Sequence, residues 1–201
     1  MTAFDQQTLD FYAGQAGTYI GHRPDEIAQE LPSFLELIPP HARILELGCG
    51  GGVDAAHMIA LGFDVEPTDG VAEMAAKAET RLGRSVRVMR FEELDAVEEF
   101  DAVIANASLL HVPLAELAAI LALVWRALKP GGWHLATYKT DAAEGRDEHG
   151  RYYNYLAREA AAAYYGSAGR WASISYDARV GVGYFSKPAQ WLKIVARKAE
   201  S

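Results

Sequence analysis

Residues 46–52, Glu-Leu-Gly-Cys-Gly-Gly-Gly, decide the fold. Residues 44–47, a short apolar run that ends in these glycines, have the pattern of a buried parallel strand. Residues 54–61 then read as a helix. Glycines permit a tight turn and let a ligand approach the backbone, and the helix offers unpaired N–H groups at its start. We therefore predict a ligand-binding turn, in preference to a glycine-rich turn without a ligand.

Strand and helix patterns alternate on both sides of this turn. We expect helices at 5–21, 26–38, 54–61, 71–82, 114–128 and 153–165. We expect strands at 44–47, 63–67, 86–90, 100–105, 133–139, 171–179 and 190–198. The first five strands alternate with helices, which predicts a mostly parallel sheet covered on both faces. The last two strands have no helix between them and are expected to form an antiparallel pair at one edge. Ligands bind beyond the carboxyl ends of the strands in such sheets.

Length, composition and charge narrow the class of protein. The chain has 201 residues, half of them hydrophobic and 23% charged. A chain of this length usually forms one domain and buries about 70% of its unfolded surface, so it needs no disulfide or metal. Its 19 Lys and Arg against 27 Asp and Glu give a net charge of −8. Nucleic acid is therefore disfavoured as the main partner, because phosphate binding depends on clustered cations.

The sequence also predicts a cytoplasmic location. Cys49 is the one cysteine, which permits neither an internal disulfide nor a cysteine zinc site and fits a reducing compartment. Residues 1–14 have neither the basic start nor the apolar run of a secretory signal. Residues 114–128 are interrupted by Glu116 and Arg126, and are too short and too polar to span a bilayer. We expect no membrane association and no metal site.

The ligand of the glycine turn is the next question. Residues 50–55 satisfy the dinucleotide pattern G-x-G-x-x-A, and Asp69 stands about 20 residues further on, where an acid can bind both ribose hydroxyls. However, Asp54 lies in the first helical turn, where it would repel a pyrophosphate. Glu46 adds a second negative charge just before the turn. Acids on both sides of the glycines suit a ligand that carries an ammonium or sulfonium group.

Five motifs in this order resemble those of the class I S-adenosylmethionine-dependent methyltransferases. Residues 46–52 resemble the family's motif I, and Asp69 matches its ribose-binding acid. The other three motifs are residues 91–94 after the third strand, residues 100–113 around the fourth strand, and residues 128–132 before the fifth. In addition, Phe11, Tyr12 and Tyr19 resemble the opening helix that covers the cofactor. The resemblance extends over nearly the whole chain.

The resemblance implies an α/β fold, a Rossmann-like three-layer αβα sandwich around a seven-stranded, mostly parallel sheet with an antiparallel C-terminal edge pair. It implies S-adenosyl-L-methionine as the cofactor. The main chain of Gly48 and Gly50 would face its methionine part and Asp69 its ribose. The predicted cofactor residues are Glu46, Gly48, Cys49, Gly50, Gly52, Asp69, Gly70, Met74, Phe91, Glu92, Asn106 and Tyr19.

The residue types at some of these positions also fit other interpretations. Met74 would lie against the adenine, but it also fits ordinary packing in a helix core. Asp69 also fits a turn residue that caps the next helix. Phe91 stands where many family members carry an acid. Residues 106–108, Asn-Ala-Ser, differ from the Asn-Pro-Pro-Tyr quartet of the amino-group methylases of DNA and glutamine, which argues against those two substrates.

The methyl acceptor is expected near the fourth and fifth strands. His111 follows the fourth strand and can accept a proton, or else it packs beneath the next helix as a loop histidine. Residues 140–155 are polar enough for a mobile lid, or for a solvated loop. Within them, Arg151 suits a carboxylate or phosphate. The predicted acceptor-binding residues are Tyr12, His111, Lys139, Arg151, Tyr152 and Tyr155, with His111 as the candidate catalytic group.

These expectations make residues 1–201 one methyltransferase domain. Residues 1–40 form a helical cover, residues 41–139 the cofactor-binding core, and residues 140–201 a lid loop, a helix and a strand pair. Little chain is left for a recognition domain, so we predict methyl transfer to a small molecule by in-line displacement, by a monomer or homodimer. The alternatives are a non-catalytic S-adenosylmethionine-binding or partner subunit, and an NAD(P)-dependent oxidoreductase.

Overall fold

The strands of the chain form a seven-stranded sheet in the order β3-β2-β1-β4-β5-β9-β8. The computed structural model describes residues 3–22, 26–183 and 188–200, apart from the side chains of residues 19–22. The strands are β1 (Arg43–Leu47), β2 (Asp64–Asp69), β3 (Arg87–Val88), β4 (Phe100–Ala105), β5 (Leu128–Lys139), β8 (Trp171–Val182) and β9 (Pro188–Lys198). β1 to β5 pair in parallel, whereas β9 runs antiparallel to both β5 and β8. The predicted sheet with its antiparallel C-terminal edge pair is thus confirmed.

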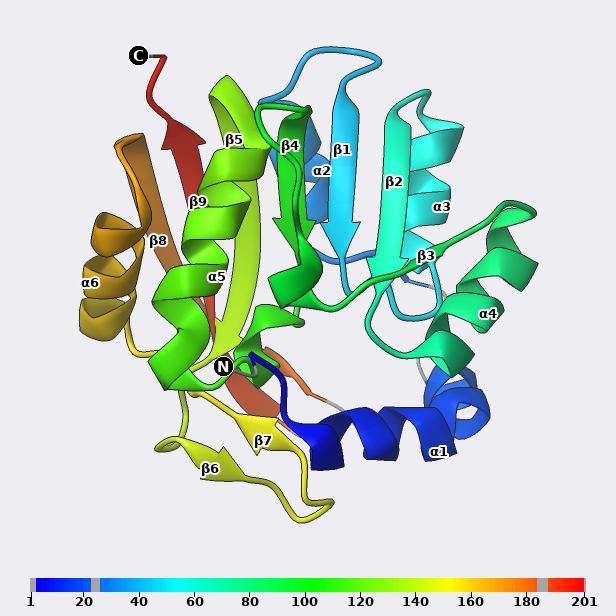
Figure 1. Cartoon of the computed structure of the whole chain (residues 1–201). Helices are drawn as coiled ribbons and strands as arrows, with labels where there is room; N and C mark the ends of the chain where they lie inside the picture. Colours follow the sequence, from blue (N-terminus) through cyan, green and yellow to red (C-terminus); the bar gives the residue numbers. More distant parts are fainter. Residues whose placement is uncertain (1–2, 23–25, 184–187, 201) are drawn as a thin grey trace.

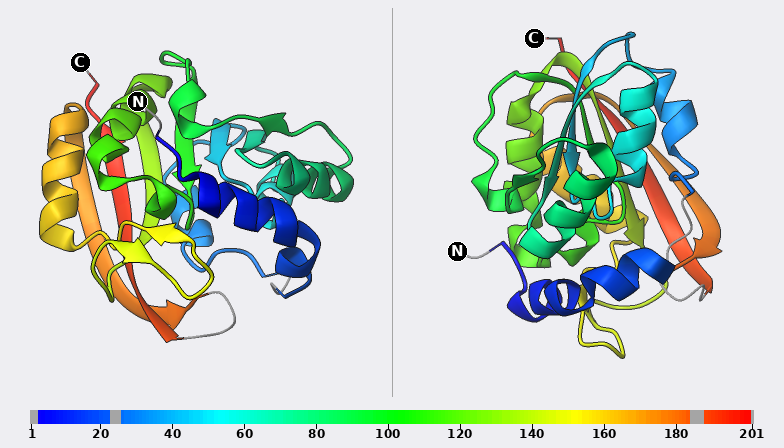
Figure 2. Two further views of the ribbon diagram at one scale, coloured as in Figure 1. Left: turned by 60° about the horizontal axis from the view of Figure 1, so that its bottom comes forward. Right: turned by 90° about the vertical axis from the view of Figure 1, so that its right-hand side faces the viewer.

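Helices cover both faces of this sheet, as Figures 1 and 2 show. They are α1 (Gln6–His22), α2 (Leu31–Leu35), α3 (Val53–Ala60), α4 (Ala72–Leu82), α5 (Leu114–Ala127) and α6 (Arg158–Ala168), with 3-10 turns η1 (Phe91–Glu93) and η2 (Leu109–His111). On one face, residues of α5 and α6 such as Leu121 and Tyr165 pack on Val103 of β4. On the other, Phe34 and Met58 from α2 and α3 pack on the same sheet. None of the helices in the described ranges is long and apolar enough to cross a membrane.

Two predicted helices differ from the observed ones. The helix expected at 26–38 is confined to α2, because Pro32 stands in its first turn, where the missing N–H of proline is tolerated. The helix expected at 153–165 begins only at Arg158. The residues before it form a short antiparallel hairpin of β6 (Gly145–Arg146) and β7 (Tyr152–Tyr153). The stretch predicted as a lid therefore contains regular structure.

The N-terminal helix crosses the end of the sheet where the parallel strands finish. Figure 1 shows α1 beneath the carboxyl ends of β1, β2 and β4, beside the hairpin β6–β7. Figure 2 shows the same two segments next to each other when this end faces the reader. Two pieces of chain that are far apart in sequence thus meet over the edge where ligands bind in parallel sheets.

Candidate active site

A pocket lies beneath α1 at this edge of the sheet. It encloses about 740 Å³, including the part that is open to solvent. Nine of the predicted site residues line it. They are Gly48, Gly50, Asp69, Gly70, Met74, Phe91 and Asn106 from the cofactor set, and Tyr12 and His111 from the acceptor set.

The glycine turn after β1 forms the floor of the pocket. Gly48, Gly50 and Gly52 have φ angles of 76°, 57° and 74°, a region that side chains other than glycine adopt at a cost. A Cβ atom on Gly48 would lie 2.6 Å from Cβ of Ser108, so the turn also needs glycine there for close packing. A Cβ atom on Gly52 would instead meet Ala78 of α4. Gly52 thus packs α3 against α4 and does not line the pocket.

Asp69, the last residue of β2, anchors this turn. Its Oδ2 accepts a hydrogen bond from the Gly50 amide at 2.9 Å, and its Oδ1 accepts one from the Val71 amide at 2.9 Å. Each carboxylate oxygen can accept a further hydrogen bond, so both remain able to receive ligand hydroxyls. Burial raises the pKa of Asp69 to about 6, although the two amide hydrogen bonds oppose this shift.

Two buried carboxylate oxygens close to this turn have no hydrogen-bond partner in the described part of the chain. They are Oε2 of Glu46 and Oε2 of Glu92. The Glu46 side chain is 3% exposed, and burial, followed by the charges of Asp54 and Asp69, raises its pKa well above the ordinary value. Buried polar groups are normally bonded, so a cation or donor supplied by a ligand fits this acidic region. Neither Glu46 nor Glu92 lines the pocket itself.

Cys49 faces away from the pocket. It packs in a cluster with Ala75, Ala78 and Val86, behind the glycine turn. Burial raises the pKa of the Cys49 thiol, which keeps it in the protonated, unreactive form. Its side chain therefore packs against α4 and does not line the pocket. The side chain of Tyr19, another predicted cofactor residue, lies outside the described residues.

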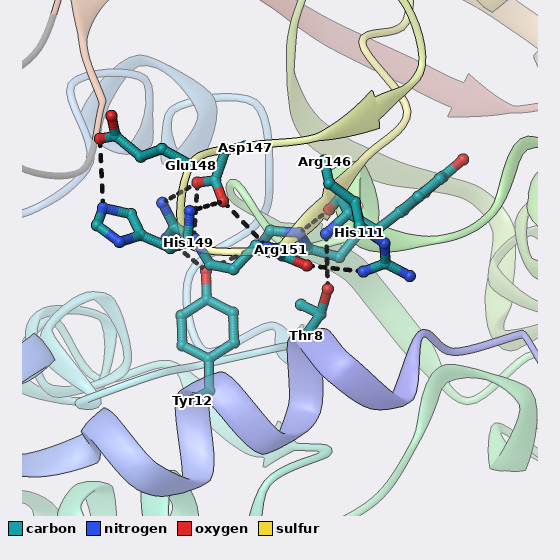
Figure 3. A network of polar contacts seen from close by, with 10 residues as sticks. Thr8, Tyr12, His111, Arg146, Asp147, Glu148, His149 and Arg151 are labelled. Atoms are coloured by element: carbon teal, nitrogen blue, oxygen red, sulfur yellow. Dashed lines mark hydrogen bonds and ion pairs between the residues drawn. The ribbon is translucent and has the colours of Figure 1, made fainter.

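His111 is held from both ring nitrogens at the other end of the pocket (Figure 3). Its Nδ1 lies 2.6 Å from the carbonyl oxygen of Tyr152, and a carbonyl only accepts, so Nδ1 carries the proton. Nε2 is then an acceptor, and the Tyr12 hydroxyl donates to it at 2.9 Å. Burial lowers the pKa of His111 to about 4. The ring is therefore neutral near pH 7, with a lone pair directed at Tyr12.

Arg151 supports this pair from inside the protein. Its side chain is 3% exposed, and its Nε and Nη2 donate to Oδ2 of Asp147 at 3.0 and 2.7 Å. Nη1 donates to the Tyr12 hydroxyl oxygen at 3.2 Å. Arg151 was predicted to bind an acidic acceptor, but it does not line the pocket and its charge is balanced by Asp147. In the structure, Arg151 instead orients the Tyr12 hydroxyl through this hydrogen bond.

Tyr152 and Tyr155 also lie outside the pocket lining. The Tyr152 hydroxyl donates to Oε1 of Glu144 and accepts a hydrogen bond from the Leu114 amide at 3.1 Å, so it ties the hairpin to the start of α5. The Tyr155 ring packs 5.5 Å from that of Tyr153. The remaining predicted acceptor residue, Lys139, ends β5 and places its ammonium over the Tyr153 ring.

The hairpin β6–β7 and α1 are joined by a set of polar contacts, and Figure 3 shows Thr8 and Tyr12 of α1 beside Arg146 and Arg151 of the hairpin. The Tyr152 amide donates to Oγ1 of Thr8 at 2.8 Å, and that hydroxyl donates to Oδ1 of Asp5 at 2.8 Å. Arg146 forms an ion pair with Asp5 at 2.6 Å. We call α1 and this hairpin the cover, because Thr8 and Tyr12 of α1 line the pocket while their polar groups contact the hairpin.

Sequence reasoning missed eight lining residues of the pocket, namely Phe4, Thr8, Leu9, Val71, Met89, Arg90, Ala107 and Ser108. Five of them lie within two positions of a predicted site residue in the chain, which is a signal that could have found them. Phe4, Thr8 and Leu9 gave no such signal, because their position depends on where α1 docks. Arg90 places its guanidinium 4.2 Å from the centre of the Phe4 ring, joining the two groups.

Comparisons with known proteins agree with this architecture. The sequence model described as a methyltransferase domain matches residues 19–174. A ubiquinone biosynthesis O-methyltransferase from Thiobacillus denitrificans is 35% identical over 99 residues, which is 45% of this chain and 41% of that protein. Its namesake from Xanthomonas axonopodis pv. citri is 37% identical over 143 residues, which is 64% of this chain and 59% of that protein. The matched region thus spans less than two thirds of either relative.

Solved structures share the fold at lower sequence identity. An S-adenosylmethionine-dependent methyltransferase from Methanosarcina mazei superposes with a TM-score of 0.74 at 17% identity, covering 85% of this chain and 98% of that one. The 1,6-didemethyltoxoflavin-N1-methyltransferase of Burkholderia thailandensis, solved with 1,6-didemethyltoxoflavin and S-adenosylhomocysteine, has a TM-score of 0.71 at 22% identity. That comparison covers 95% of this chain and 85% of the other.

Proposed function

Because this chain belongs to the methyltransferase domain family, we propose that it transfers a methyl group from S-adenosyl-L-methionine to a small-molecule acceptor. The observation that carries the proposal is the pocket between the glycine turn and α1, with Asp69 at one end and the Tyr12–His111 pair at the other. When bound, S-adenosylmethionine would supply a methyl group on a positively charged sulfur. The acceptor atom would bond to this methyl carbon in line as the carbon–sulfur bond breaks, which releases S-adenosylhomocysteine. The relatives and structural neighbours named as methyltransferases support this assignment.

The residues present fit this cofactor. The turn at Gly48 and Gly50 gives a ligand access to the backbone, and both oxygens of Asp69 can accept from ribose hydroxyls. Met74 and Phe91 offer apolar surface for the adenine. Oε2 of Glu46 is buried without a hydrogen-bond partner among the described residues, and a cationic ligand placed near it would favour the ionised form of this carboxyl. We propose Glu92, which also has an unpaired buried oxygen, as the partner of the adenine amino group.

The Tyr12–His111 pair is proposed to receive the acceptor. Because Nε2 of His111 accepts from Tyr12, the Tyr12 oxygen has its remaining lone pair for an incoming hydroxyl, amine or thiol, beside the donor Nη1 of Arg151. As the acceptor loses its proton to Tyr12, the tyrosine proton moves to Nε2 of His111. Asn106, bonded to Oδ2 of Asp54 at 3.2 Å and to Thr137 at 2.8 Å, forms a fixed wall nearby.

A titration of the protein with S-adenosylmethionine, S-adenosylhomocysteine and NADH tests the cofactor. We expect saturable binding of the first two and none of NADH, because Asp54 in the first turn of α3 opposes a pyrophosphate. Tight binding of NADH without binding of the other two ligands would contradict the proposal and favour an NAD(P)-dependent oxidoreductase. A turnover assay with labelled methyl donor over a panel of acceptors then separates an enzyme from a non-catalytic binding subunit.

Cofactor affinity is predicted to fall in acid. The ionised form of Asp69 accepts ribose hydroxyls best, and its pKa is about 6. At pH 5 only about one tenth of the free protein is then ionised at Asp69, so S-adenosylhomocysteine should bind about tenfold more weakly than at pH 7.5. Calorimetry at the two pH values measures the difference. Asp69→Asn is the control, and its weaker affinity should not change between these pH values. An unchanged affinity of the unmodified protein would contradict the role of Asp69.

The cover is predicted to control ligand exchange. Thr8→Val keeps the shape of the side chain but leaves the Tyr152 amide without its acceptor, which costs about 1–3 kcal/mol. We expect S-adenosylhomocysteine to dissociate about tenfold faster, and also to associate faster, in stopped-flow measurements. A lost ligand contact would raise the dissociation rate alone. Thr80→Val is the matched control, because its hydroxyl bonds only within α4, to Ala76, and it should leave both rates unchanged.

A further inference from the structure

Lys139 is a half-buried cation that forms no salt bridge with the described residues. It is the last residue of β5, so it stands at the sheet edge that carries the pocket. Its Nζ lies 4.4 Å from the centre of the Tyr153 ring and 5.9 Å from that of Trp191. Within the described ranges of the chain, neither an ion pair nor a hydrogen bond involves this ammonium group. Two aromatic rings are thus its neighbours where a carboxylate would be expected.

The acids around Lys139 bond to other groups. Asp147 accepts from Arg151, and Asp141 accepts from the Gln190 amide at 3.4 Å. Burial, and then the charge of Arg151, lower the pKa of Lys139. The positive charge at this position is therefore only partly compensated by the protein, and an anion placed beside it would stabilise the charged form.

A second donor beside Lys139 also lacks an acceptor. Trp191 of β9 is the direct neighbour of Lys139 in the antiparallel pair β5–β9. Its side chain is 7% exposed, yet its indole Nε1 has no hydrogen-bond acceptor in the part of the chain that the structure describes. Buried N–H groups are normally bonded, and leaving one unbonded is destabilising. Two unbonded donors therefore stand side by side on neighbouring strands.

These donors are connected to the proposed acceptor site through one aromatic ring. The centre of the Tyr153 ring lies 4.6 Å from that of the His111 ring. The Lys139 ammonium lies over the same Tyr153 ring. His111 in turn lines the pocket beside Tyr12. The Lys139 ammonium is therefore separated from the Tyr12–His111 pair by one aromatic ring.

We propose that the methyl acceptor is an organic anion with a carboxylate or similar oxygen group, and that Lys139 binds this group with help from the indole N–H of Trp191. This inference rests on the proposed function, since it concerns the acceptor of that reaction. Lys139 is a specificity-determining residue here, and it selects the acceptor by charge. The aromatic faces of Tyr153 and Trp191 favour a flat acceptor in the same place.

Matched pairs of acids and amides test the proposal directly. The probes are acetate and acetamide, benzoate and benzamide, and indole-3-acetate and indole-3-acetamide, titrated into protein saturated with S-adenosylhomocysteine. We expect at least one acid to bind tenfold or more tightly than its amide. In Lys139→Met, which keeps an unbranched side chain but removes the ammonium group, that preference should fall to twofold or less. Trp191→Phe, which keeps an aromatic ring but removes the indole N–H, should reduce it to an intermediate value.

The control variant is Lys193→Met. Lys193 lies on β9 close to the same residues, but its ammonium is paired with Asp177 at 3.0 Å, so the preference for acids should persist without it. The proposal is overturned if no acid is preferred over its amide in any pair, or if the preference survives in Lys139→Met. S-adenosylhomocysteine binding is measured first in every variant. If the unmodified protein does not bind S-adenosylhomocysteine, the proposed function is refuted. If it binds S-adenosylhomocysteine but prefers no acid over its amide, only the role of Lys139 is refuted.

Discussion

Replacement of Gly50 by alanine is expected to abolish tight binding of S-adenosylhomocysteine while the protein remains folded. Gly50 lines the pocket, and its φ is 57°. An added Cβ atom would find only Cε of Met74 within 4 Å, at 3.7 Å. The chain can therefore accommodate the methyl group, but it would stand between the glycine turn and Met74, where the ligand is proposed to lie. Filling a closely packed site typically costs about 1–3 kcal/mol, so we expect an affinity loss of tenfold to about a hundredfold.

Gly83→Ala is the matched control for this experiment. Gly83 ends α4 with a φ of 63°, and a Cβ atom there would meet nothing within 4 Å. Both variants bear the same left-handed backbone strain, about 1–2 kcal/mol, so thermal unfolding should show similar losses of stability. Only Gly50→Ala should lose affinity in calorimetry. Equal affinities in the two variants would show that the ligand does not approach the glycine turn.

Tyr12→Phe is expected to lower kcat by about a hundredfold or more, because general acid–base groups contribute about 10²–10⁴ to the rate. The variant keeps the ring but removes the hydroxyl that joins Arg151 to Nε2 of His111. His111→Asn should cause a similar loss. If the two residues act as one relay, the double variant should be no slower than either single variant. Steady-state kinetics with an acceptor found in the panel measures all three.

The core provides a matched control for the Tyr12–His111 pair. His134 of β5 places Nδ1 2.9 Å from the carbonyl oxygen of Val103 and Nε2 3.1 Å from the hydroxyl of Tyr165. Burial lowers its pKa to about 4, as it does for His111. This second pair lies outside the lining of the pocket. Tyr165→Phe should therefore reduce stability but not kcat, and an equal loss of kcat in Tyr12→Phe and Tyr165→Phe would mean that Tyr12 is merely structural.

The pH dependence of kcat provides a further test of His111. Its folded pKa of about 4 lies below the ordinary value of 6.5, so the ring stays neutral down to about pH 4. The loss of activity due to protonation of His111 should therefore occur near pH 4 and not near pH 6.5. Folding favours the neutral ring, so its contribution to stability is complete above pH 6.5 and is lost as the pH falls toward 4.

Local sequence determined the part of the site that is proposed to hold the cofactor. Glycines between an apolar strand and a helix are typical of a ligand-binding turn in a parallel sheet, and Asp69 lies beside that turn because β2 pairs with β1. The order of the strands then places His111, after β4, at the same edge. Each of these inferences needs only short-range patterns and the general geometry of parallel sheets.

The tertiary structure alone decided what the charged and polar side chains of the cover do. From the sequence, Arg151 and Tyr152 looked like acceptor ligands, and residues 140–155 like a free lid. In the fold, Arg151 meets Asp147 and a tyrosine 139 residues away in the chain, and becomes part of the scaffold. The type of a side chain determines which hydrogen bonds and ion pairs it can form. Its actual partner depends on which segments of the chain the fold brings together. Those segments meet only when α1 docks across the sheet, and no local periodicity encodes that contact.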